Sequence, residues 1–502
     1  MSNARRWAVT AGVMTGMFIA ALEATVVGTA MPTVIASLGG ISYYSWVFTA
    51  YIVTSTVTVP VWGKLSDIYG RRPMYQIGIG LFLLGTLLSG LSTSMAQLIA
   101  FRAIQGLGAG ALIPLGMTII GDTFTMRERA RMQAYFSSVW GFSSVIGPLI
   151  GGFLTDQLSW RWVFFINLPI GVMAAVIIGF ALKEPKQHQR PTIDYAGAGL
   201  LMLAISLLML GMVEGGQSLR SLLRPESVFL FAAGFVLLAI FAFVEMRAKD
   251  PIIPFPMFRN RIVAASVGAG FLAGVAMFGA ISFIPLFAQG ALGMTATEAG
   301  SLLTPLMLSW VVMAVVGGRL LLRISYRTIA IGGFVILTAG FVLLALFGRE
   351  TPRIWLYLEL ALIGAGLGFT MFTLLIAVQQ AVERTQLGIA TALNQFSRAI
   401  GGAFGVAVMG VALTAGLSTE LTRAAELPGS SLSHAQAEEF AANPNALIEP
   451  HAKASISPAT LNTLQTAMAE AIHPIFWIGA VVSLMALFVT LLLPARLPRE
   501  ES

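Results

Sequence analysis

Residues 63–73 read Gly63-Lys64-Leu65-Ser66-Asp67-Ile68-Tyr69-Gly70-Arg71-Arg72-Pro73. They separate two apolar segments, at 43–62 and 74–92, that contain no aspartate, glutamate, lysine or arginine. A helix of about 20 apolar residues is long enough to cross the hydrocarbon core of a bilayer. The sequence here therefore predicts a basic loop between two transmembrane helices.

The same alternation of apolar segments and short polar loops continues along all 502 residues. Hydrophobic residues make up 57% of the chain and charged residues 11%, whereas about 25% of a soluble domain is charged. This composition excludes a soluble enzyme and a disordered chain, and the absence of cysteine excludes a disulfide scaffold or a thiolate metal site. The apolar segments predict fourteen helices, near residues 7–36, 43–62, 74–92, 95–120, 133–155, 162–182, 196–213, 227–246, 262–290, 298–317, 328–348, 354–378, 386–415 and 474–493.

The distribution of basic residues predicts the orientation of these helices. If the N-terminus is cytoplasmic, most lysines and arginines fall in cytoplasmic loops, as expected for a membrane protein. Both termini are then cytoplasmic, and the long segment 416–473 is external. The net charge of +7 needs no nucleic-acid partner, because cytoplasmic loops are basic anyway. We expect a multi-pass protein of the plasma (inner) membrane.

An internal repeat divides the chain into two halves. Three pairs of short segments recur at nearly the same spacing, and they are Gly63-Lys64-Leu65 with Gly318-Arg319-Leu320, Gly147–Gly151 with Gly401–Gly405, and Pro32 with Pro285. The alternative is chance similarity among glycine-rich helices. The repeat predicts two pseudo-symmetric six-helix bundles, at 1–182 and 262–502, with linkers and two inserted helices at 183–261. This is a plan of secondary transporters, and no phosphate-binding loop for ATP is present.

Four motifs resemble those of a known family. The loop at 63–73 is similar to the pattern G-x-L-x-D-x-x-G-R-[RK]. The other three are Arg102-Ala103-Ile104-Gln105-Gly106, Gly147-Pro148-Leu149-Ile150-Gly151-Gly152 and Leu22-Glu23-Ala24-Thr25-Val26-Val27. Together they resemble the fourteen-helix drug:proton antiporter family of the major facilitator superfamily. The resemblance implies an all-α polytopic membrane protein that exchanges protons for exported compounds.

The resemblance implies a gating role for the loop. Its residues would be Gly63, Asp67, Gly70, Arg71 and Arg72, with the glycines allowing tight turns. Asp67 is expected against the cytoplasmic, N-terminal end of the helix predicted at 386–415, where the helix dipole attracts an anion. The alternative is a solvated acid that balances the arginines.

The antiporter motif consists of Gly147, Pro148, Gly151 and Gly152. It predicts a bent helix that is thin on one face. We expect this helix to pack against its pseudo-symmetric partner, whose matching residues are Gly401, Gly402 and Gly405. Close packing without any role in transport is the alternative.

Glu23 is the only acid deep in any of the first six predicted helices. A carboxyl group in the membrane interior is costly enough to indicate a function. Apolar surroundings favour its neutral form, so Glu23, with Arg102 nearby, is the predicted proton-coupling residue. The family usually has aspartate here. A structural pair with Arg102 is the alternative, and Glu359 and Arg398 are the secondary charged candidates.

The predicted substrate cavity lies between the two halves. Its aromatic and polar candidates are Tyr51, Trp140, Phe278, Trp310, Asn394 and Gln395. An aromatic cavity that also holds a carboxylate suits lipophilic cations. Ordinary packing is the alternative for each residue.

The external segment 416–473 contains two helix-start signals. Ser433 with Gln436 forms a capping-box pattern, and Ser457-Pro458 favours the start of a helix. The segment therefore predicts a small helical hairpin outside the membrane.

The functional prediction is a proton-driven exporter of hydrophobic, cationic compounds that works by alternating access. A dedicated exporter of one endogenous lipid or metabolite is an alternative, and a non-transporting membrane sensor or assembly subunit is another. No nucleophile–base set suggests an enzyme. We expect a monomer without cofactor or metal, whose partners are protons, small hydrophobic substrates and the lipid bilayer.

Overall fold

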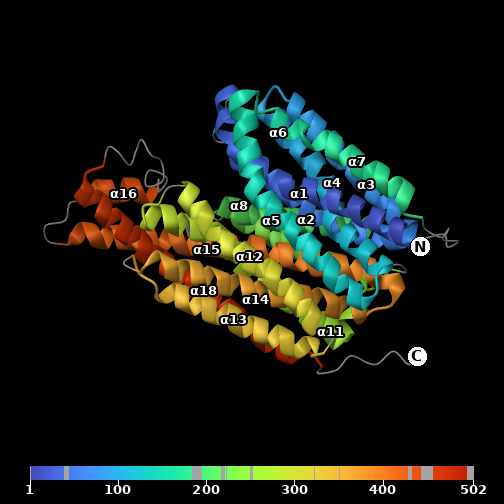
Figure 1. The fold of residues 1–502 in the computed structure, drawn as a ribbon. Helices are drawn as coiled ribbons and strands as arrows, with labels where there is room; N and C mark the ends of the chain where they lie inside the picture. The colour runs from blue at the N-terminus through green and yellow to red at the C-terminus, as the bar shows by residue number, and fades with distance from the viewer. Residues whose placement is uncertain are drawn as a thin grey trace.

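The helices of this chain group into two inclined bundles (Figure 1). A computed structural model describes residues 2–38, 44–183, 195–215, 221, 223–248, 251, 253–294, 296–321, 323–349, 351–427, 432–442 and 456–494. Every element formed by these described residues is helical. The bundles meet at the end that carries the N-terminus and separate toward α16. We call these the closed end and the open end.

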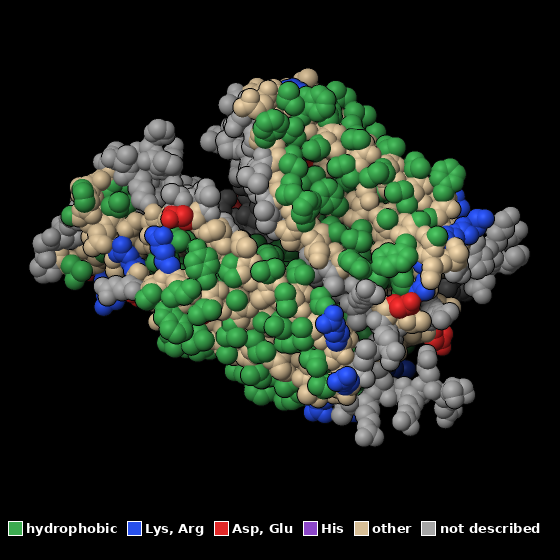
Figure 2. Space-filling view, in the orientation of Figure 1, with side chains coloured by type: hydrophobic (Ala, Val, Ile, Leu, Met, Phe, Trp, Pro, Cys, Tyr) green, Lys and Arg blue, Asp and Glu red, His purple; other side chains and the backbone are tan. Residues whose placement is uncertain are grey.

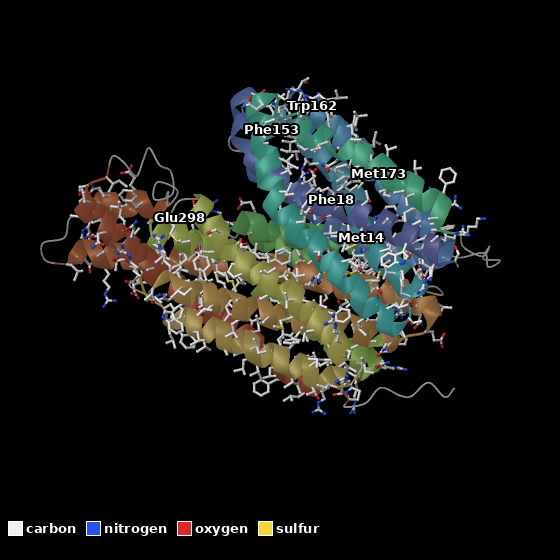
Figure 3. All side chains as sticks on the ribbon, in the orientation of Figure 1. Met14, Phe18, Phe153, Trp162, Met173 and Glu298 are labelled. Atoms are coloured by element: carbon white, nitrogen blue, oxygen red, sulfur yellow. The ribbon has the colours of Figure 1, made fainter. Side chains whose placement is uncertain are left out.

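The N-terminal bundle contains the first seven helices. These are α1 (Asn3–Leu38), α2 (Tyr44–Tyr69), α3 (Arg71–Leu91), α4 (Met95–Thr123), α5 (Met126–Gln157), α6 (Trp162–Phe165) and α7 (Asn167–Ala181). Its core is built from apolar side chains of α1, α3, α4 and α7. Figure 3 shows Phe153, Trp162 and Met173 exposed on the surface of this bundle, as expected for helices that face lipid.

The C-terminal bundle has its own core. Its elements are η2 (Phe255–Arg259), α11 (Arg261–Leu286), the π-helical turn η3 (Phe287–Ala291), α12 (Ala296–Leu320), α13 (Tyr326–Leu346), α14 (Arg353–Gln380), η4 (Arg384–Gln386), α15 (Leu387–Glu426), α16 (His434–Ala442) and α18 (Pro458–Leu491). Helices α11, α12, α13, α14 and α18 supply most of the buried apolar side chains. The two bundles touch mainly through α2 against α15 and α5 against α12.

The two inserted helices pack on the contact between the bundles. Helices α8 (Tyr195–Gly215) and α10 (Pro225–Glu245) lie against each other, and α8 also contacts α2 and α15. Leu201 and Ile205 of α8 belong to an apolar cluster with Val53 of α2 and Leu393 of α15. The inserted pair therefore covers one side of the α2–α15 contact.

Eleven helices among the described residues are long and apolar enough to cross a membrane. Helices α2, α5 and α8 lie at the three other predicted spans. The all-helical membrane fold is confirmed, whereas the total of fourteen spans stays a prediction. Capping side chains begin several helices: Ser94 accepts a hydrogen bond from the N–H of Gln97, and Asn260 accepts one from the N–H of Ile262.

Several predicted helix bounds are wrong. Helix α2 continues to Tyr69 through most of the expected loop, α5 begins at Met126, and the helix expected at 162–182 is divided after Phe165. The hydropathy of a segment falls where it leaves the bilayer, but backbone hydrogen bonding continues into polar residues. Helix ends therefore lie beyond the apolar segments.

The prediction of a small external helical hairpin is also wrong for the second helix of the hairpin. Ser433 and Gln436 do form the capping box that begins α16, and the Ser457-Pro458 start is confirmed. However, α18 runs from Pro458 to Leu491 as one helix, so its first turns extend the last span beyond the apolar segment. Residues 428–431 and 443–455 lie outside the described part of the chain.

The glycine-rich helices pack inside each half and not against each other. A Cβ added at Gly147 of α5 would lie 2.0 Å from Oγ1 of Thr25 in α1, and one added at Gly402 of α15 would lie 2.2 Å from Cδ2 of Phe278 in α11. Thr25 and Phe278 precede Pro32 and Pro285 by the same number of residues. The prediction that α5 packs on α15 is thus wrong for the described residues: α5 packs mainly on α1 and α12 and α15 mainly on α11, and α1 fills the space at Gly147 and α11 the space at Gly402. The equivalent contacts do agree with the internal repeat.

A notch separates the bundles at the open end (Figure 2). At the closed end, α2 and the start of α15 lie in contact. The molecule is therefore closed between its halves at one end and open at the other.

The α11–α15 packing predicts a difference between two glycine substitutions. A Cβ added at Gly401 of α15 would lie 2.0 Å from the carbonyl oxygen of Phe271, whereas Gly332 of α13 has nothing within 4 Å of that position. We expect Gly401→Ala to destabilise the protein by about 1–3 kcal/mol. Gly332→Ala should be neutral or stabilise it by about 0.5–1 kcal/mol. Thermal unfolding in detergent measures both, and equal melting temperatures would contradict the packing.

Candidate functional site

Asp67 joins the two bundles at the closed end. It lies in the last turn of α2, and its carboxylate accepts hydrogen bonds from the backbone N–H groups of Gly388 (3.1 Å) and Ile389 (2.9 Å). These are the first residues of α15, whose N–H groups have no partner within the helix. The expected contact between Asp67 and this helix end is thus present in the structure.

Arg71 holds the Asp67 carboxylate in place. The two side chains form an ion pair, and Arg71 also donates to Ser66 Oγ (3.1 Å) and to Asp122 Oδ2 (3.0 Å). Asp122 lies near the end of α4 and was not among the predicted site residues. Its only sequence signal was an acid at the end of an apolar helix. The cluster connects α2, α3 and α4 to the N-terminal start of α15.

The two loop glycines have different roles. Gly70 caps α3 with φ 97°, a backbone conformation that favours glycine, so the expected turn is present there. Gly63 lies inside α2 and not in a turn. A Cβ at Gly63 would lie 2.5 Å from the Cβ of Ala392, so this glycine allows α15 to approach. Arg72 is the second residue of α3.

Glu23 and Arg102 form an ion pair inside the N-terminal bundle. Glu23 has no exposed surface and Arg102 is 2% exposed. The second carboxylate oxygen of Glu23 accepts a hydrogen bond from Asn167 Nδ2 (2.6 Å). Both oxygens therefore accept from donors, which is the pattern of an ionised carboxylate.

The other side chains of this network orient Arg102. Gln105 Oε1 accepts from Arg102 Nη1 (2.9 Å), and Gln105 Nε2 donates to Thr86 Oγ1 (2.6 Å). The guanidinium lies 4.2 Å from the ring centroid of Tyr51, a cation–π distance. The network thus connects α1, α2, α3, α4 and α7. Asn167 and Thr86 were not predicted as members, because an isolated polar residue in a helix does not indicate its partner.

Two residues of the antiporter motif in α5, Gly147 and Gly151, are buried. Gly147 contacts Thr25, whose Oγ1 donates to the carbonyl oxygen of Ser143 (3.2 Å), and Gly151 is buried. Pro148 and Gly152 belong to α5, but their surroundings lie outside the described part. The motif therefore positions α1, which carries Glu23.

The predicted cavity residues lie on the five helices α2, α5, α11, α12 and α15, and a single cavity that they line together stays a prediction. Tyr51 belongs to the Arg102 network, whereas Trp140 of α5 and Phe278 of α11 are 39% and 37% exposed. Trp310 packs on the core of the C-terminal bundle. Asn394 and Gln395 are each 5% exposed, and they lie in α15 close to Arg398.

The two secondary charged candidates lie far apart. Glu359 is buried near the start of α14, and neither of its oxygens has a hydrogen-bond partner among the described residues. Arg398 donates to Gln395 Oε1, and its Nη1 lies 3.8 Å from Met371 Sδ of α14. Gln395 Nε2 contacts Met117 Sδ of α4 at 2.6 Å. Arg398 therefore lies beside the contact between the bundles, and Glu359 does not.

The Asp67 contact predicts how the closed end responds to mutation. Asp67→Asn removes the charge that the N–H groups of α15 bind, which should weaken closure by about 2 kcal/mol. Spin labels at Tyr69→Cys and Gln386→Cys, both exposed, would report the separation of α2 and α15. The chain contains no native cysteine. We expect a longer distance population in Asp67→Asn.

Glu383→Gln is the matched control for that experiment. Glu383 is an exposed acid of the α14–α15 connection, and its carboxylate accepts a hydrogen bond from the hydroxyl group of neighbouring Thr385. The control should keep the distance distribution of the labelled parent. An unchanged distribution in Asp67→Asn would show that the contact does not hold the bundles together.

Comparison with known proteins agrees with this architecture. Residues 13–406 match the Major Facilitator Superfamily. The chain is 35% identical over 517 residues to the Multidrug transporter protein MdtP of Bacillus subtilis (strain 168), covering 100% of this chain and 95% of the relative. It is also 35% identical over 475 residues to Multidrug resistance protein 3 of the same organism, covering 95% and 92%.

A solved structure has the same fold. The human organic anion transporter MFSD10 (TETRAN) superposes with a TM-score of 0.62 over 98% of this chain and 100% of that one, at 17% identity. At that identity the likeness concerns the fold alone. The family match and the two bacterial relatives lead to one conclusion: the chain belongs to the Major Facilitator Superfamily of membrane transporters.

Proposed function

We propose that this protein exports hydrophobic compounds from the cell in exchange for protons. The names of its relatives, a multidrug transporter and a multidrug resistance protein, support transport of a range of drugs. The observation that carries the proton-coupling proposal is the Glu23–Arg102 pair, a carboxylate and a guanidinium buried together in a membrane bundle. Such pairs are costly, and they are found where a transporter moves charge.

The proton would bind to Glu23. In the observed arrangement each carboxylate oxygen accepts from one donor, Arg102 or Asn167, and a proton that binds to Glu23 weakens its attraction to Arg102. Protonation removes the negative charge that holds Arg102, while Gln105 and the Tyr51 ring remain as partners for the guanidinium. Binding and release of one proton thus change the position of Arg102 in the N-terminal bundle.

The closed end would open when this bundle rotates. Asp67 and the start of α15 form a contact that one rigid movement can break, because each bundle has its own core. Breaking it would expose the space between the halves at the closed end. We propose that this end faces the cytoplasm, in agreement with the basic residues near the end of α2 and at the start of α3, Lys64, Arg71 and Arg72.

The rest of the proposal follows the sequence expectations. The protein would lie in the plasma (inner) membrane with both termini cytoplasmic and would function as a monomer. Protons and small hydrophobic substrates would be its partners, and it would need no cofactor. Asp122, which shares Arg71 with Asp67, would join the gating residues.

The role of Glu23 can be tested by efflux under an imposed pH gradient. Glu23→Gln keeps the size of the side chain but cannot bind a proton, so we expect gradient-driven efflux from proteoliposomes to fall at least about tenfold. Glu23→Asp keeps the carboxylate and should retain substantial activity. Equilibrium binding of a neutral substrate should change little in either variant.

Glu226→Gln provides the control. Glu226 is an exposed acid in the first turn of α10, so its loss should not affect efflux. If Glu23→Gln still coupled efflux to the pH gradient, the proton site would lie elsewhere, and Glu359 would be the next residue to test.

A further inference from the structure

Arg398 is the second arginine inside the membrane bundles, and its surroundings differ from those of Arg102. It lies in α15 and is partly exposed. Its oxygen partner among the described residues is Gln395 Oε1, and its other near neighbour is the sulfur of Met371. A guanidinium has five N–H donors and keeps its charge in proteins, so most of its donors are free to bind a ligand.

No carboxylate neutralises Arg398 in the described part of the chain. Each ion pair found there involves other residues, and the pair of Arg102 with Glu23 has the least exposed side chains among them. The nearest buried acid on α14 is Glu359, twelve residues before Met371. That spacing is about 18 Å along a helix. The charge of Arg398 is therefore unbalanced.

The polar groups beside Arg398 are also donors. Asn394 lies one turn earlier on α15, is 5% exposed, and has an Nδ2 group without a hydrogen-bond acceptor. The side-chain oxygen of Gln395 is occupied by Arg398, and its Nε2 contacts the sulfur of Met117. A buried donor without a partner is costly. The region around Arg398 and Asn394 therefore lacks a negatively charged hydrogen-bond acceptor.

Apolar side chains surround these donors. Met371 of α14 and Met117 of α4 contribute flexible, polarisable surfaces that adapt to different ligand shapes. One turn beyond Arg398 toward the open end, Phe278 covers Gly402. Because Met117 belongs to the N-terminal bundle, a ligand at Arg398 would touch both halves.

We propose that Arg398 and Asn394 bind the acidic group of a lipophilic anion, so that the substrates of this transporter include hydrophobic carboxylic acids. Arginine binds carboxylates through two parallel hydrogen bonds. This inference rests on the proposed export function and names its substrate class. The sequence favoured cations because Glu23 was expected in the cavity, but both oxygens of Glu23 are occupied inside the N-terminal bundle.

The test compares two dyes that share a xanthene ring system and differ in charge. Fluorescein is an anion, and tetramethylrhodamine ethyl ester is a cation. Fluorescence anisotropy measures their affinities for the purified full-length protein in detergent, without a pH gradient. We expect the wild-type protein to bind fluorescein more tightly than the cationic dye.

Three variants assign that preference to Arg398. Arg398→Gln should weaken fluorescein binding at least about tenfold and leave binding of the cationic dye unchanged or stronger, whereas Arg398→Lys should retain an intermediate affinity for fluorescein. Arg423→Gln removes the same charge from an exposed position of α15 and should bind both dyes like wild type. The proposal is overturned if wild type prefers the cation or binds neither dye. Equal losses for both dyes in Arg398→Gln, or no loss, would also overturn it.

The dye-binding test and the proton-coupling test can fail independently of each other. A protein that prefers the anion but does not couple efflux to a pH gradient would contradict the proposed exchange and support the Arg398 site. A protein that couples efflux but binds the two dyes without preference would contradict only the Arg398 site.

Discussion

The contact between the Asp67 carboxylate and the first N–H groups of α15 joins the two bundles at the closed end. It is a polar link between two bundles that each have a large core and that also meet through α5 and α12 and through the apolar cluster of α2, α8 and α15. Gly63 makes the contact possible because no side chain keeps α2 away from Ala392. With one end held in this way, the halves separate at the other, where α16 lies.

The charged side chains inside the two bundles differ in whether they have a partner of opposite charge. In the N-terminal bundle Arg102 and Glu23 neutralise each other, and Asn167 and Gln105 complete their hydrogen bonds. In the C-terminal bundle Arg398 has no carboxylate beside it in the described residues. This asymmetry suggests a division of labour in the proposed transporter, in which one half binds the proton and the other binds the charged part of the substrate. The inserted helices α8 and α10 cover the contact along which the halves would move.

The sequence predicted features that depend on local composition, and it failed where tertiary packing decides. Long apolar segments identified the helices, and the resemblance of the loop motif, together with the helix dipole, led to the Asp67 contact. The partners of glycine faces were not predictable, since Gly147 and Gly401 indicate a close approach but not which helix approaches. Asp122 and Asn167 were missed for a similar reason: a polar residue finds its partner only when distant helices are packed together.

Proton movement driven by substrate is the most direct test of the proposed exchange of substrate for protons across the membrane. Proteoliposomes without a pH gradient would be loaded with a pH-sensitive dye and exposed to a gradient of a transported compound. We predict that substrate flow in one direction drives protons in the other, so that the internal pH changes only with active protein. Substrate flow that leaves the internal pH constant would contradict the proposed exchange of substrate for protons.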